Sequence, residues 1–384
     1  MKKNSMRKIV VLGAGRVGAI VARELAKEKD FDVTAADVSA ESLERAARGT
    51  RLRTVRADLS NPAAVGRLVA PFDFVAGALP GWMGFQALRA VIEAGKDCVD
   101  ISFMPEDALD LDGLAREKGV TVVFDCGVAP GMSNMLVGSA AATFTKLDRV
   151  RILVGGLPCV RSWPYQYKAP FSPADVLEEY TRPARLVENG KPVSRPALSE
   201  PEPVEVPGLG TLEAFNTDGL RSLIRTIDAP SMVEKTLRYP GHRDLMLVLR
   251  ESGFFGEKEI EIRGVKVRPI DLTSRLLFAQ WAFAEGEEDF TFMRIEVEGR
   301  KGKSAARARW DLYDRYDPET RTLSMARTTG FPGAIVAAMV ARGEIGRPGV
   351  VPPEELGKDP AILKKVLAEL ARRGVRFASV KEED

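Results

Sequence analysis

The chain has 384 residues, a formal net charge of +2 at pH 7, 45% hydrophobic residues and 29% charged residues. This length predicts two domains, each with its own core. Basic and acidic residues are interspersed, and no apolar segment reaches the roughly 18 residues of a membrane-spanning helix, so neither nucleic acid nor membrane is an expected partner. Residues 1–4 show no signal-peptide pattern, and Cys98, Cys126 and Cys159 show no metal or disulfide spacing. We expect a cytoplasmic protein without a bound metal.

An apolar run, Ile9–Leu12, leads into the sequence Gly13-Ala14-Gly15-Arg16-Val17-Gly18 and then into a predicted helix that ends at Lys27. The spacing Gly-x-Gly-x-x-Gly between a strand and a helix is typical of a dinucleotide-binding turn. The first glycine permits the turn, the second lets the backbone approach a pyrophosphate, and the third lets helix and strand pack closely. We therefore expect five residues of this turn to contact the cofactor: Gly13, Gly15, Arg16, Val17 and Gly18.

A second predicted strand, Val33–Ala36, ends at Asp37. A carboxylate at this point is the expected partner of a ribose 2′-hydroxyl, and it would repel a 2′-phosphate. Because no arginine follows Asp37 directly, the sequence favours NAD over NADP.

Strand and helix signals continue to alternate up to about residue 127. Further strands are predicted over Arg51–Arg56, Phe74–Ala78, Cys98–Ser102 and Val120–Asp125, with a helix over Ala108–Lys118 before the last of them. This rhythm predicts an α/β fold with a Rossmann-type doubly wound parallel sheet. Ligands of such sheets bind at the carboxyl ends of the strands. The remaining residues expected to bind the cofactor lie there: Asp58, Ala78, Leu79, Pro80, Gly127 and Pro130.

The pattern changes after about residue 150, where a region rich in proline and aromatic residues predicts loops through Pro207. Alternating strands follow over Glu259–Ile262, Phe290–Val297 and Ala306–Tyr313, which predict an antiparallel sheet in a second, α+β domain. Two helices, Ala334–Ala341 and Ala361–Arg373, come last. We expect three parts: an NAD-binding domain over residues 1–130, a substrate-binding and oligomerisation domain over 131–330, and a helical segment over 331–384 that packs back on the first domain.

Several motifs along the chain resemble one known family. The turn Val122–Asn134 is similar to the signature turn of the saccharopine dehydrogenase superfamily. Further similar motifs follow in order: Val154–Pro158, Glu178–Arg185, Asp218–Ser222, Thr236–His242 and Gly346–Pro353. Together they most resemble NAD-dependent lysine 6-dehydrogenases. One departure is Gly219-Leu220-Arg221-Ser222, where some bacterial members of that group carry Gly-Thr-Ser.

The resemblance implies an oxidoreductase that transfers hydride from the carbon bearing the ε-amine of L-lysine to NAD. The imine would be hydrolysed to the 6-semialdehyde, which cyclises. A saccharopine dehydrogenase or a related carboxy-polyamine dehydrogenase is the alternative within this chemistry, and Arg225 and Arg243 could bind the additional carboxylates. A non-catalytic NAD-binding protein is the alternative from another class. We expect a small-molecule amino-acid substrate and a homo-oligomer, a dimer.

The reaction requires a group that takes up a proton from the substrate amine. Deprotonating the lysine amine at pH 7 costs about 4.6 kcal/mol, so a base or a desolvating pocket must assist. His242, the only histidine, is one candidate base, and Asp100 and Asp125, at predicted strand ends, are the others. Each could instead be structural.

A substrate α-carboxylate calls for the planar fork of an arginine. Arg221 and Arg238 lie in two of the second-domain motifs and are the candidates, although surface ion pairs are the usual use of arginine. Ser102 and Tyr167 are further candidates for contact with the substrate, with a strand-end serine and a core aromatic residue as the alternatives.

Overall fold

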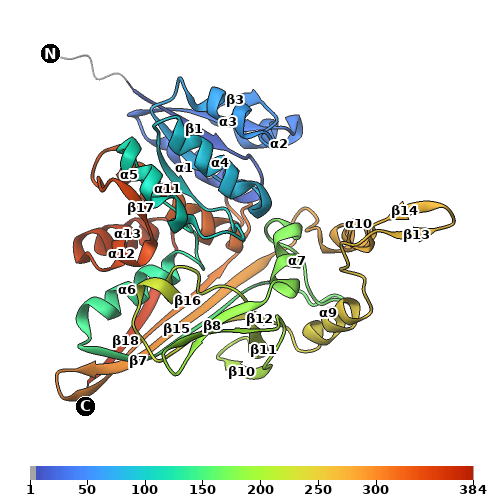
Figure 1. Cartoon of the computed structure of the whole chain (residues 1–384), viewed down its shortest axis with the longest axis vertical. Helices are drawn as coiled ribbons and strands as arrows, with labels where there is room; N and C mark the ends of the chain where they lie inside the picture. Colours follow the sequence, from blue (N-terminus) through green and yellow to red (C-terminus); the bar gives the residue numbers. More distant parts are fainter. Residues whose placement is uncertain (1–5, 384) are drawn as a thin grey trace. The chain divides into compact units, whose positions relative to one another are not determined.

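The computed structural model describes residues 6–383 and consists of two compact units (Figure 1). Unit 1 contains the chain up to Ala142 together with Ala326–Val375, and unit 2 contains Thr143–Met325 together with the residues from Arg376 onward. The first division thus falls after residue 142 rather than at 130. The segment after Val375 joins unit 2 rather than unit 1, because it adds a strand to the sheet of unit 2. Residues 1–4, over which the sequence predicted no signal peptide, lie outside the described residues.

Unit 1 is built on a seven-stranded sheet whose neighbouring strands are all parallel, which confirms the predicted α/β class. The strand order is β17-β6-β5-β4-β1-β2-β3. Because β2 and β4 pair with opposite sides of β1, the order reverses there, and such a switch point is where open α/β sheets bind ligands. The strands are β1 (Arg7–Leu12), β2 (Phe31–Asp37), β3 (Arg53–Arg56), β4 (Phe74–Gly77), β5 (Asp97–Asp100), β6 (Thr121–Val123) and β17 (Gly349–Val351).

Some helices of unit 1 begin at a residue whose side chain caps them. Ser39 Oγ accepts a hydrogen bond from Ser42 N, and Asn61 accepts one from Ala63 N. The predicted helix over 108–118 is a 3₁₀ turn followed by a short α-helix. The elements are α1 (Arg16–Lys27), α2 (Ala40–Ala47), α3 (Pro62–Val69), α4 (Gly81–Glu93), η1 (Ala108–Leu111), α5 (Asp112–Lys118), α6 (Met132–Thr143), α11 (Ser324–Ala341), α12 (Pro353–Gly357) and α13 (Pro360–Arg372).

Unit 2 contains a nine-stranded sheet in which β7 (Lys146–Pro158) and β12 (Ser231–Arg238) form a parallel pair. The other pairs are antiparallel, so the sheet is mixed rather than antiparallel throughout. Its remaining strands are β8 (Ala184–Glu188), β9 (Lys191–Arg195), β10 (Glu202–Val206), β11 (Gly210–Asn216), β15 (Asp289–Lys301), β16 (Ser304–Arg315) and β18 (Phe377–Glu383).

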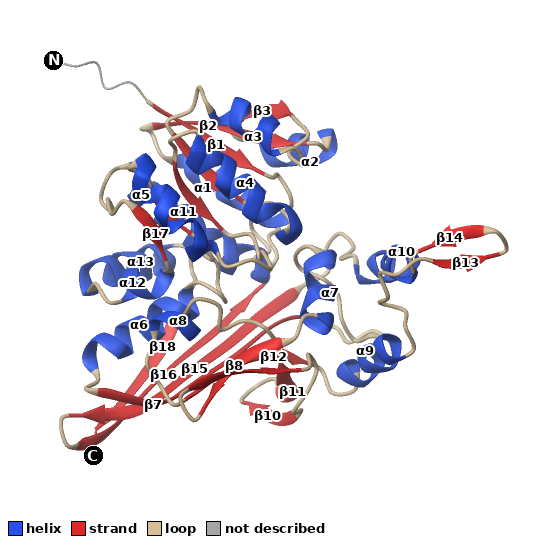
Figure 2. Cartoon of the chain, viewed as in Figure 1, coloured by secondary structure: helices blue, strands red, loops and turns tan. Residues whose placement is uncertain are grey.

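Two sequence expectations for unit 2 were wrong. The region up to Pro207 is not loop alone, because it contains α7 (Pro173–Thr181) and strands β8 to β10. The strand predicted over Glu259–Ile262 does not join the large sheet: β13 (Ile260–Ile262) and β14 (Val265–Val267) form a separate hairpin (Figure 2). The other helices of unit 2 are α8 (Leu223–Thr226), α9 (His242–Glu251) and α10 (Pro269–Trp281). No helix within residues 6–383 is long and apolar enough to cross a membrane.

Candidate active site

The glycine turn between β1 and α1 has the geometry of a pyrophosphate cradle. Gly13 has φ +96°, and a Cβ there would lie 2.4 Å from the carbonyl oxygen of Ala78. A Cβ on Gly18 would lie 2.2 Å from the carbonyl oxygen of Gly13, so both positions exclude a side chain. Gly15 is exposed, and a Cβ there would meet nothing within 4 Å. Together with exposed Arg16 and half-buried Val17, it leaves open space at the start of α1, where the helix favours an anion.

Asp37, at the end of β2, holds this turn in place. Its Oδ2 accepts a hydrogen bond from Ala14 N (2.6 Å), and its Oδ1 accepts one from Ser39 N (2.8 Å). A cation that the sequence did not predict lies at the same edge of the sheet. Arg56, at the end of β3, is the register partner of Asp37, and its Nε donates to the carbonyl oxygen of Val38 (3.0 Å). Arg56 was missed because β3 follows β2 only after an intervening helix.

The other residues expected near the cofactor lie in loops after the strands. Asp58 is exposed, and hydrogen bonds from the hydroxyl and the N–H of Ser60 hold the pKa of its carboxyl below the ordinary value. Ala78 and Pro80 are half-buried, whereas Leu79 is buried and donates its N–H to Ser102 Oγ (3.2 Å). The loop after β4 is thus tied to the end of β5.

Asp100 is a buried carboxyl at the end of β5. Its Oδ1 accepts from Ser102 N (2.7 Å), and its Oδ2 accepts from Ser102 Oγ (3.2 Å). A Cβ on Gly77 would lie 1.8 Å from Asp100 Oδ2, so the glycine makes room for the carboxyl. Burial raises the pKa of Asp100 to about 6, the negative charge of Asp125 adds to this effect, and the two bonds from Ser102 oppose it.

The chain after β6 closes a tight turn on itself. Asp125 is buried and has φ +49°. Gly127 N donates to the carbonyl oxygen of Pro130 (3.1 Å), and the carbonyl oxygen of Gly127 accepts from Met132 N (2.9 Å). A Cβ on Gly131 would lie 2.1 Å from that same oxygen. The compact turn brings backbone to the carboxyl edge of the sheet, next to Asp100, whose carbonyl oxygen accepts from Cys126 N (3.0 Å).

His242 lies in unit 2, where it is 1% exposed. Its Nδ1 donates to the carbonyl oxygen of Tyr165 (2.8 Å), and its Nε2 accepts from the hydroxyl of Tyr180 (2.9 Å). Burial, together with the nearby charge of Arg238, lowers the pKa of His242 to about 3. Both ring nitrogens are occupied and the ring is neutral, which argues against the expected role as a base and favours the structural alternative.

Arg238, the last residue of β12, is built into the same core. Its Nε donates to the hydroxyl of Tyr180 (3.1 Å), its Nη1 donates to the carbonyl oxygen of Leu237 (3.0 Å), and its Nη2 forms an ion pair with Glu179. The guanidinium lies over the ring of buried Tyr167, 4.5 Å from its centroid. These contacts use all three nitrogens of the fork, and they argue against direct contact of Arg238 or Tyr167 with a substrate in this conformation.

The motif over Asp218–Ser222 is also buried. Asp218 accepts two hydrogen bonds from the guanidinium of Arg185, at 2.8 Å from Nε and 2.7 Å from Nη2. Arg221 is 7% exposed and has φ +54°. Sequence analysis did not select Glu234, which is buried on β12, accepts from the hydroxyl of Thr217 (2.6 Å) and has a pKa raised by burial to about 8. Strand β12 also contains Ser231, Lys235, Thr236 and Arg238, so nothing in the sequence singles out Glu234.

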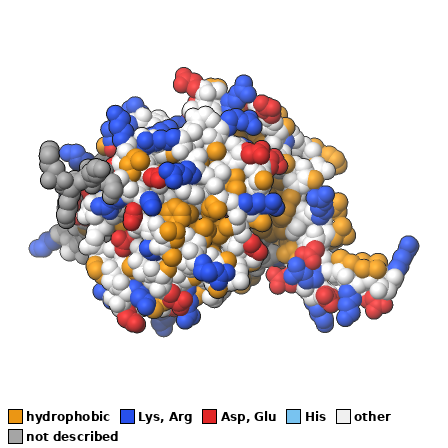
Figure 3. Space-filling model, turned by 90° about the horizontal axis from the view of Figure 1, so that it is seen from above, with side chains coloured by type: hydrophobic (Ala, Val, Ile, Leu, Met, Phe, Trp, Pro, Cys, Tyr) orange, Lys and Arg blue, Asp and Glu red, His pale blue; other side chains and the backbone are white. Residues whose placement is uncertain are grey.

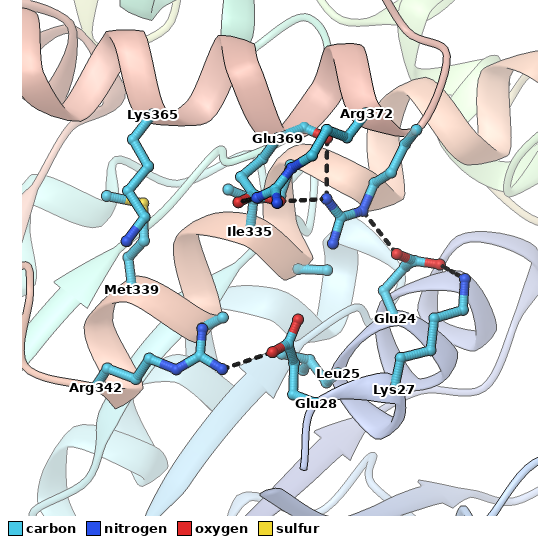
Figure 4. A pocket seen from close by; sticks show the side chains of 13 residues that line it. Glu24, Leu25, Lys27, Glu28, Ile335, Met339, Arg342, Lys365, Glu369 and Arg372 are labelled. Atoms are coloured by element: carbon cyan, nitrogen blue, oxygen red, sulfur yellow. Dashed lines mark hydrogen bonds and ion pairs between the residues drawn. The ribbon is translucent and has the colours of Figure 1, made fainter. Parts of the chain in front are cut away.

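Unit 1 also has a groove between α1, α11 and α13, with a cavity volume of about 520 Å³ (Figure 4). Its charged side chains pair with one another: Glu24 with Lys27 and Arg373, and Glu28 with Arg342. The groove is lined by the carboxyl half of α1, whereas the glycine turn precedes the amino end of that helix. None of the residues expected to bind the cofactor lines it, so we do not assign it to the active site.

Comparisons with known proteins agree with this arrangement. Residues 9–123 match the family described as "Saccharopine dehydrogenase NADP binding domain", and residues 127–375 match "Saccharopine dehydrogenase C-terminal domain". A saccharopine dehydrogenase (NADP⁺, L-glutamate-forming) of Schizosaccharomyces pombe is 22% identical over 448 residues, covering 97% of this chain and 98% of the relative. A carboxyaminopropylagmatine dehydrogenase of Synechocystis is 22% identical over 383 residues, covering 94% and 95%.

The solved structure of apo saccharopine dehydrogenase (L-Glu forming) from Saccharomyces cerevisiae superposes with a TM-score of 0.79, at 18% identity, over 98% of this chain and 100% of that one. This likeness concerns the fold. The two family matches together span most of the sequence, and unit 1 has the open glycine turn of an NAD(P)-binding domain. The chain therefore belongs to the saccharopine dehydrogenase family of NAD(P)-binding oxidoreductases.

Proposed function

We propose that this protein is an NAD-dependent dehydrogenase that oxidises the carbon bearing the ε-amine of L-lysine. The carbon loses a hydride and the nitrogen loses a proton, which leaves an imine. Water then hydrolyses the imine to ammonia and the 6-semialdehyde, which cyclises. The nicotinamide, when bound, supplies the hydride acceptor, and the open space at Gly15 supports binding of its dinucleotide at the start of α1.

The observation that favours lysine is the internal neutralisation of three of the four arginines in the motifs of unit 2. Arg185 is paired with Asp218, Arg238 with Glu179, and Arg182 with Glu178 (3.2 Å). Saccharopine carries three carboxylates, whereas lysine carries one. Because these three arginines are already balanced by carboxylates, they offer less positive charge to a polyanionic substrate, and this arrangement suits the substrate with a single carboxylate.

Asp100 is the best of the three candidate bases. Because its pKa is about 6, the carboxyl of Asp100 is largely ionised at pH 7, and this pKa is close enough to that pH for the carboxylate to take up a proton. In this proposal Asp100 accepts the proton that leaves the substrate amine, while Ser102 keeps the carboxyl oriented through its N–H and hydroxyl. His242 is proposed to be structural, since its two nitrogens are already bonded.

NAD is proposed as the cofactor because Asp37 places a negative charge where a 2′-phosphate would bind. Two observations favour NADP: the side chain of Arg56 lies at the same edge of the sheet, and residues 9–123 match a family described as NADP-binding. The replacement Asp37→Ser should weaken NAD binding and improve NADP binding, by about 1–3 kcal/mol for the lost charged hydrogen bonds. The matched replacement Arg56→Ser should leave NAD use unchanged. Equal use of both cofactors by the unmodified protein would contradict the assignment.

The second candidate is a dehydrogenase that cleaves a secondary amine, as in saccharopine. The end-to-end matches to a fungal saccharopine dehydrogenase and to a cyanobacterial carboxyaminopropylagmatine dehydrogenase favour it.

One assay separates the candidates. Purified protein is supplied with NAD or NADP and, in turn, with L-lysine, saccharopine, L-ornithine and a diamine, and reduction of the cofactor is followed by absorbance. Reduction of NAD with lysine alone supports the proposal. Turnover of saccharopine without turnover of lysine replaces it with the second candidate. Cofactor binding without turnover of any of the four supports the non-catalytic alternative.

A further inference from the structure

The groove between α1, α11 and α13 is a cavity that the proposed reaction does not use (Figure 4). Its volume of about 520 Å³ falls within the roughly 300–1,000 Å³ of sites that bind small molecules. Every residue that lines it belongs to unit 1, so the groove is formed within one compact unit. It is therefore a candidate for a second small-molecule site.

The floor of the groove is aliphatic. Ile335 lies three residues before Ala338 and four before Met339 on α11, so the three side chains share one face of that helix. Leu25 of α1 also lines the groove. Such a floor suits a short hydrocarbon chain, because contact removes apolar surface from water.

The walls of the groove are charged. Three acidic residues line it: Glu24, Glu28 and Glu369. Five basic residues line it as well: Lys27, Arg342, Lys365, Arg372 and Arg373. Each of these basic residues forms an ion pair with at least one carboxylate. The groove therefore offers charges of both signs at close quarters.

The charges of the walls are balanced. Two carboxylates outside the lining, Asp30 and Glu344, pair with Arg342 and Lys365, so five cations meet five carboxylates. A ligand with a single charge would upset this balance, whereas a zwitterion leaves it unchanged. Acidic and basic side chains are also interspersed on the face of the molecule that Figure 3 shows. Selection of a small ligand thus depends on the local pattern of charges in the groove rather than on a long-range field of one sign.

Helix α13 offers partners for both charges of a zwitterion. Lys365, Glu369 and Arg372 follow one another at intervals of four and three residues, so they lie on one helix face. Figure 4 shows all three side chains extending from α13 toward the groove. The side chain of Arg372 is 70% exposed, and that of Lys365 is 44% exposed. An ion pair as exposed as that of Arg372 with Glu369 contributes little to stability, so a ligand can separate the two charges at small cost.

We propose that this groove is an effector site for a small α-amino acid with an unbranched aliphatic side chain. The carboxylate of the amino acid binds Arg372 and Lys365, its ammonium binds Glu369, and its side chain packs on the floor formed by α11. Both charges of an α-amino acid are attached to one carbon, which matches neighbouring charges of opposite sign on one helix face. A simple carboxylate would leave Glu369 without a ligand group, and a simple amine would leave Arg372 without one.

A chain of contacts joins this site to the helix that follows the glycine turn. Glu369 Oε2 accepts from Arg373 Nη1 (2.8 Å), and Arg373 Nε donates to Glu24 Oε2 on α1 (2.7 Å). In the amino-terminal half of α1, a Cβ on Gly330 of α11 would lie 2.9 Å from Ile20 Cβ, so these two helices are in close contact there too. An amino acid that holds α1, α11 and α13 together is expected to tighten dinucleotide binding at the start of α1 by about fivefold or more. By linkage, the dinucleotide tightens binding of the amino acid by the same factor.

The test uses L-norleucine, which has an unbranched aliphatic side chain and no ε-amine to oxidise. Isothermal titration calorimetry of the full chain is expected to show saturable binding at one site per chain. Hexanoate, which lacks the ammonium, and pentylamine, which lacks the carboxylate, should each bind more weakly by about tenfold or more. A second titration, with saturating NAD or NADP, measures the coupling between the two sites.

Two variants of the groove and one matched control locate the binding. Arg372→Ala removes a partner of the carboxylate, Glu369→Gln removes the partner of the ammonium, and each should weaken norleucine binding by about tenfold or more. The control is Lys364→Ala, because Lys364 is an exposed lysine on the same helix that does not line the groove. It should bind norleucine as the wild type does. Thermal unfolding verifies that each variant is folded, and either groove variant decides the question if the other does not fold.

Weaker binding in the groove variants together with unchanged binding in Lys364→Ala supports the proposal. The absence of saturable binding to the wild type overturns it, as does norleucine binding that both groove variants retain, since the ligand then lies elsewhere. Hexanoate binding as tight as that of norleucine overturns the assignment to an amino acid. Norleucine binding that leaves the affinity for the dinucleotide unchanged overturns the effector role.

Discussion

Replacing Asp100 with asparagine should stabilise the protein at neutral pH. The pKa of Asp100 is about 6 in the folded protein against 3.8 ordinarily, because burial penalises the carboxylate. Between pH 3.8 and about pH 6, the carboxyl of Asp100 keeps a proton in the folded protein that it has released in the unfolded chain. Stability therefore falls as the pH rises from about 4 to 6, and it stays lowered above that range. The pKa difference of about 2.2 corresponds to about 3 kcal/mol of stability missing at pH 7.

Asparagine has nearly the same shape and removes this cost. Its carbonyl oxygen can still accept from Ser102 N, and its amide faces the hydroxyl of Ser102, which can accept. The gain should approach about 3 kcal/mol near pH 7 and vanish near pH 4. Since each kcal/mol moves the melting temperature of a domain this size by about 2–4 °C, thermal unfolding at the two pH values measures it directly. The matched control is Asp97→Asn on the same strand, where Oδ1 accepts from Thr121 N (2.7 Å).

The same variant should lose activity. Without a carboxylate to take the amine proton, kcat/KM should fall by about 10²–10⁴-fold, and the ascending limb of the pH profile near pH 6 should disappear. Removal of a carboxyl that destabilises the fold but serves the reaction is expected to raise the stability and lower the rate. If Asp100→Asn were less stable than the wild type at neutral pH, the argument from burial would be wrong. If it were more stable and fully active, Asp100 would not be the base.

Three contacts in the structure give further testable outcomes. Gly15→Ala should fold normally yet weaken NAD binding by about 1–3 kcal/mol, whereas Gly18→Ala, whose Cβ meets a carbonyl oxygen at 2.2 Å, should lower the melting temperature. Binding titration and thermal unfolding compare the two variants, and equal behaviour of the two would refute the distinction. His242→Gln should lower the free energy of unfolding by about 1–3 kcal/mol near pH 7 with little change in kcat. It should also reduce the loss of stability that the wild type shows as the pH falls from 6.5 toward 3. A large loss of kcat in a stable variant would restore the role of His242 as a base. Arg238→Leu should cost about 3–5 kcal/mol in denaturant unfolding, because it removes a buried ion-pair partner and leaves half-buried Glu179 without its cation. The double variant with Glu179→Leu should recover part of the loss, and an unchanged midpoint in the single variant would contradict this.

The sequence predicts best what is encoded locally. Strand β1 and the glycine turn were predicted because four apolar residues lead directly into three glycines with the spacing Gly-x-Gly-x-x-Gly. Strand β17 was not predicted, because Gly349–Val351 is only three residues long and pairs with β6 from far away in the chain.

The candidate site divides in the same way. Gly15 and Asp37 lie close together in sequence and keep a geometry suited to a dinucleotide. His242 was considered as a base because the sequence does not reveal its hydrogen-bond partner, the hydroxyl of Tyr180, which lies 62 residues earlier. The neutral state of such a histidine depends on burial and on contacts between distant segments, which no local pattern specifies.

The large sequence separation between β6 and β17 affects how the protein folds during its synthesis on the ribosome. Strand β6 ends at Val123, and β17 begins at Gly349, so 226 positions separate the two. At about 5–20 residues per second, translation needs some tens of seconds to deliver the second strand after the first. During that interval the side of β6 turned away from β5 presents bare N–H and C=O groups, a template for mispairing with any nearby chain. A holding chaperone that covers this strand until Val351 has emerged would raise the yield of native protein.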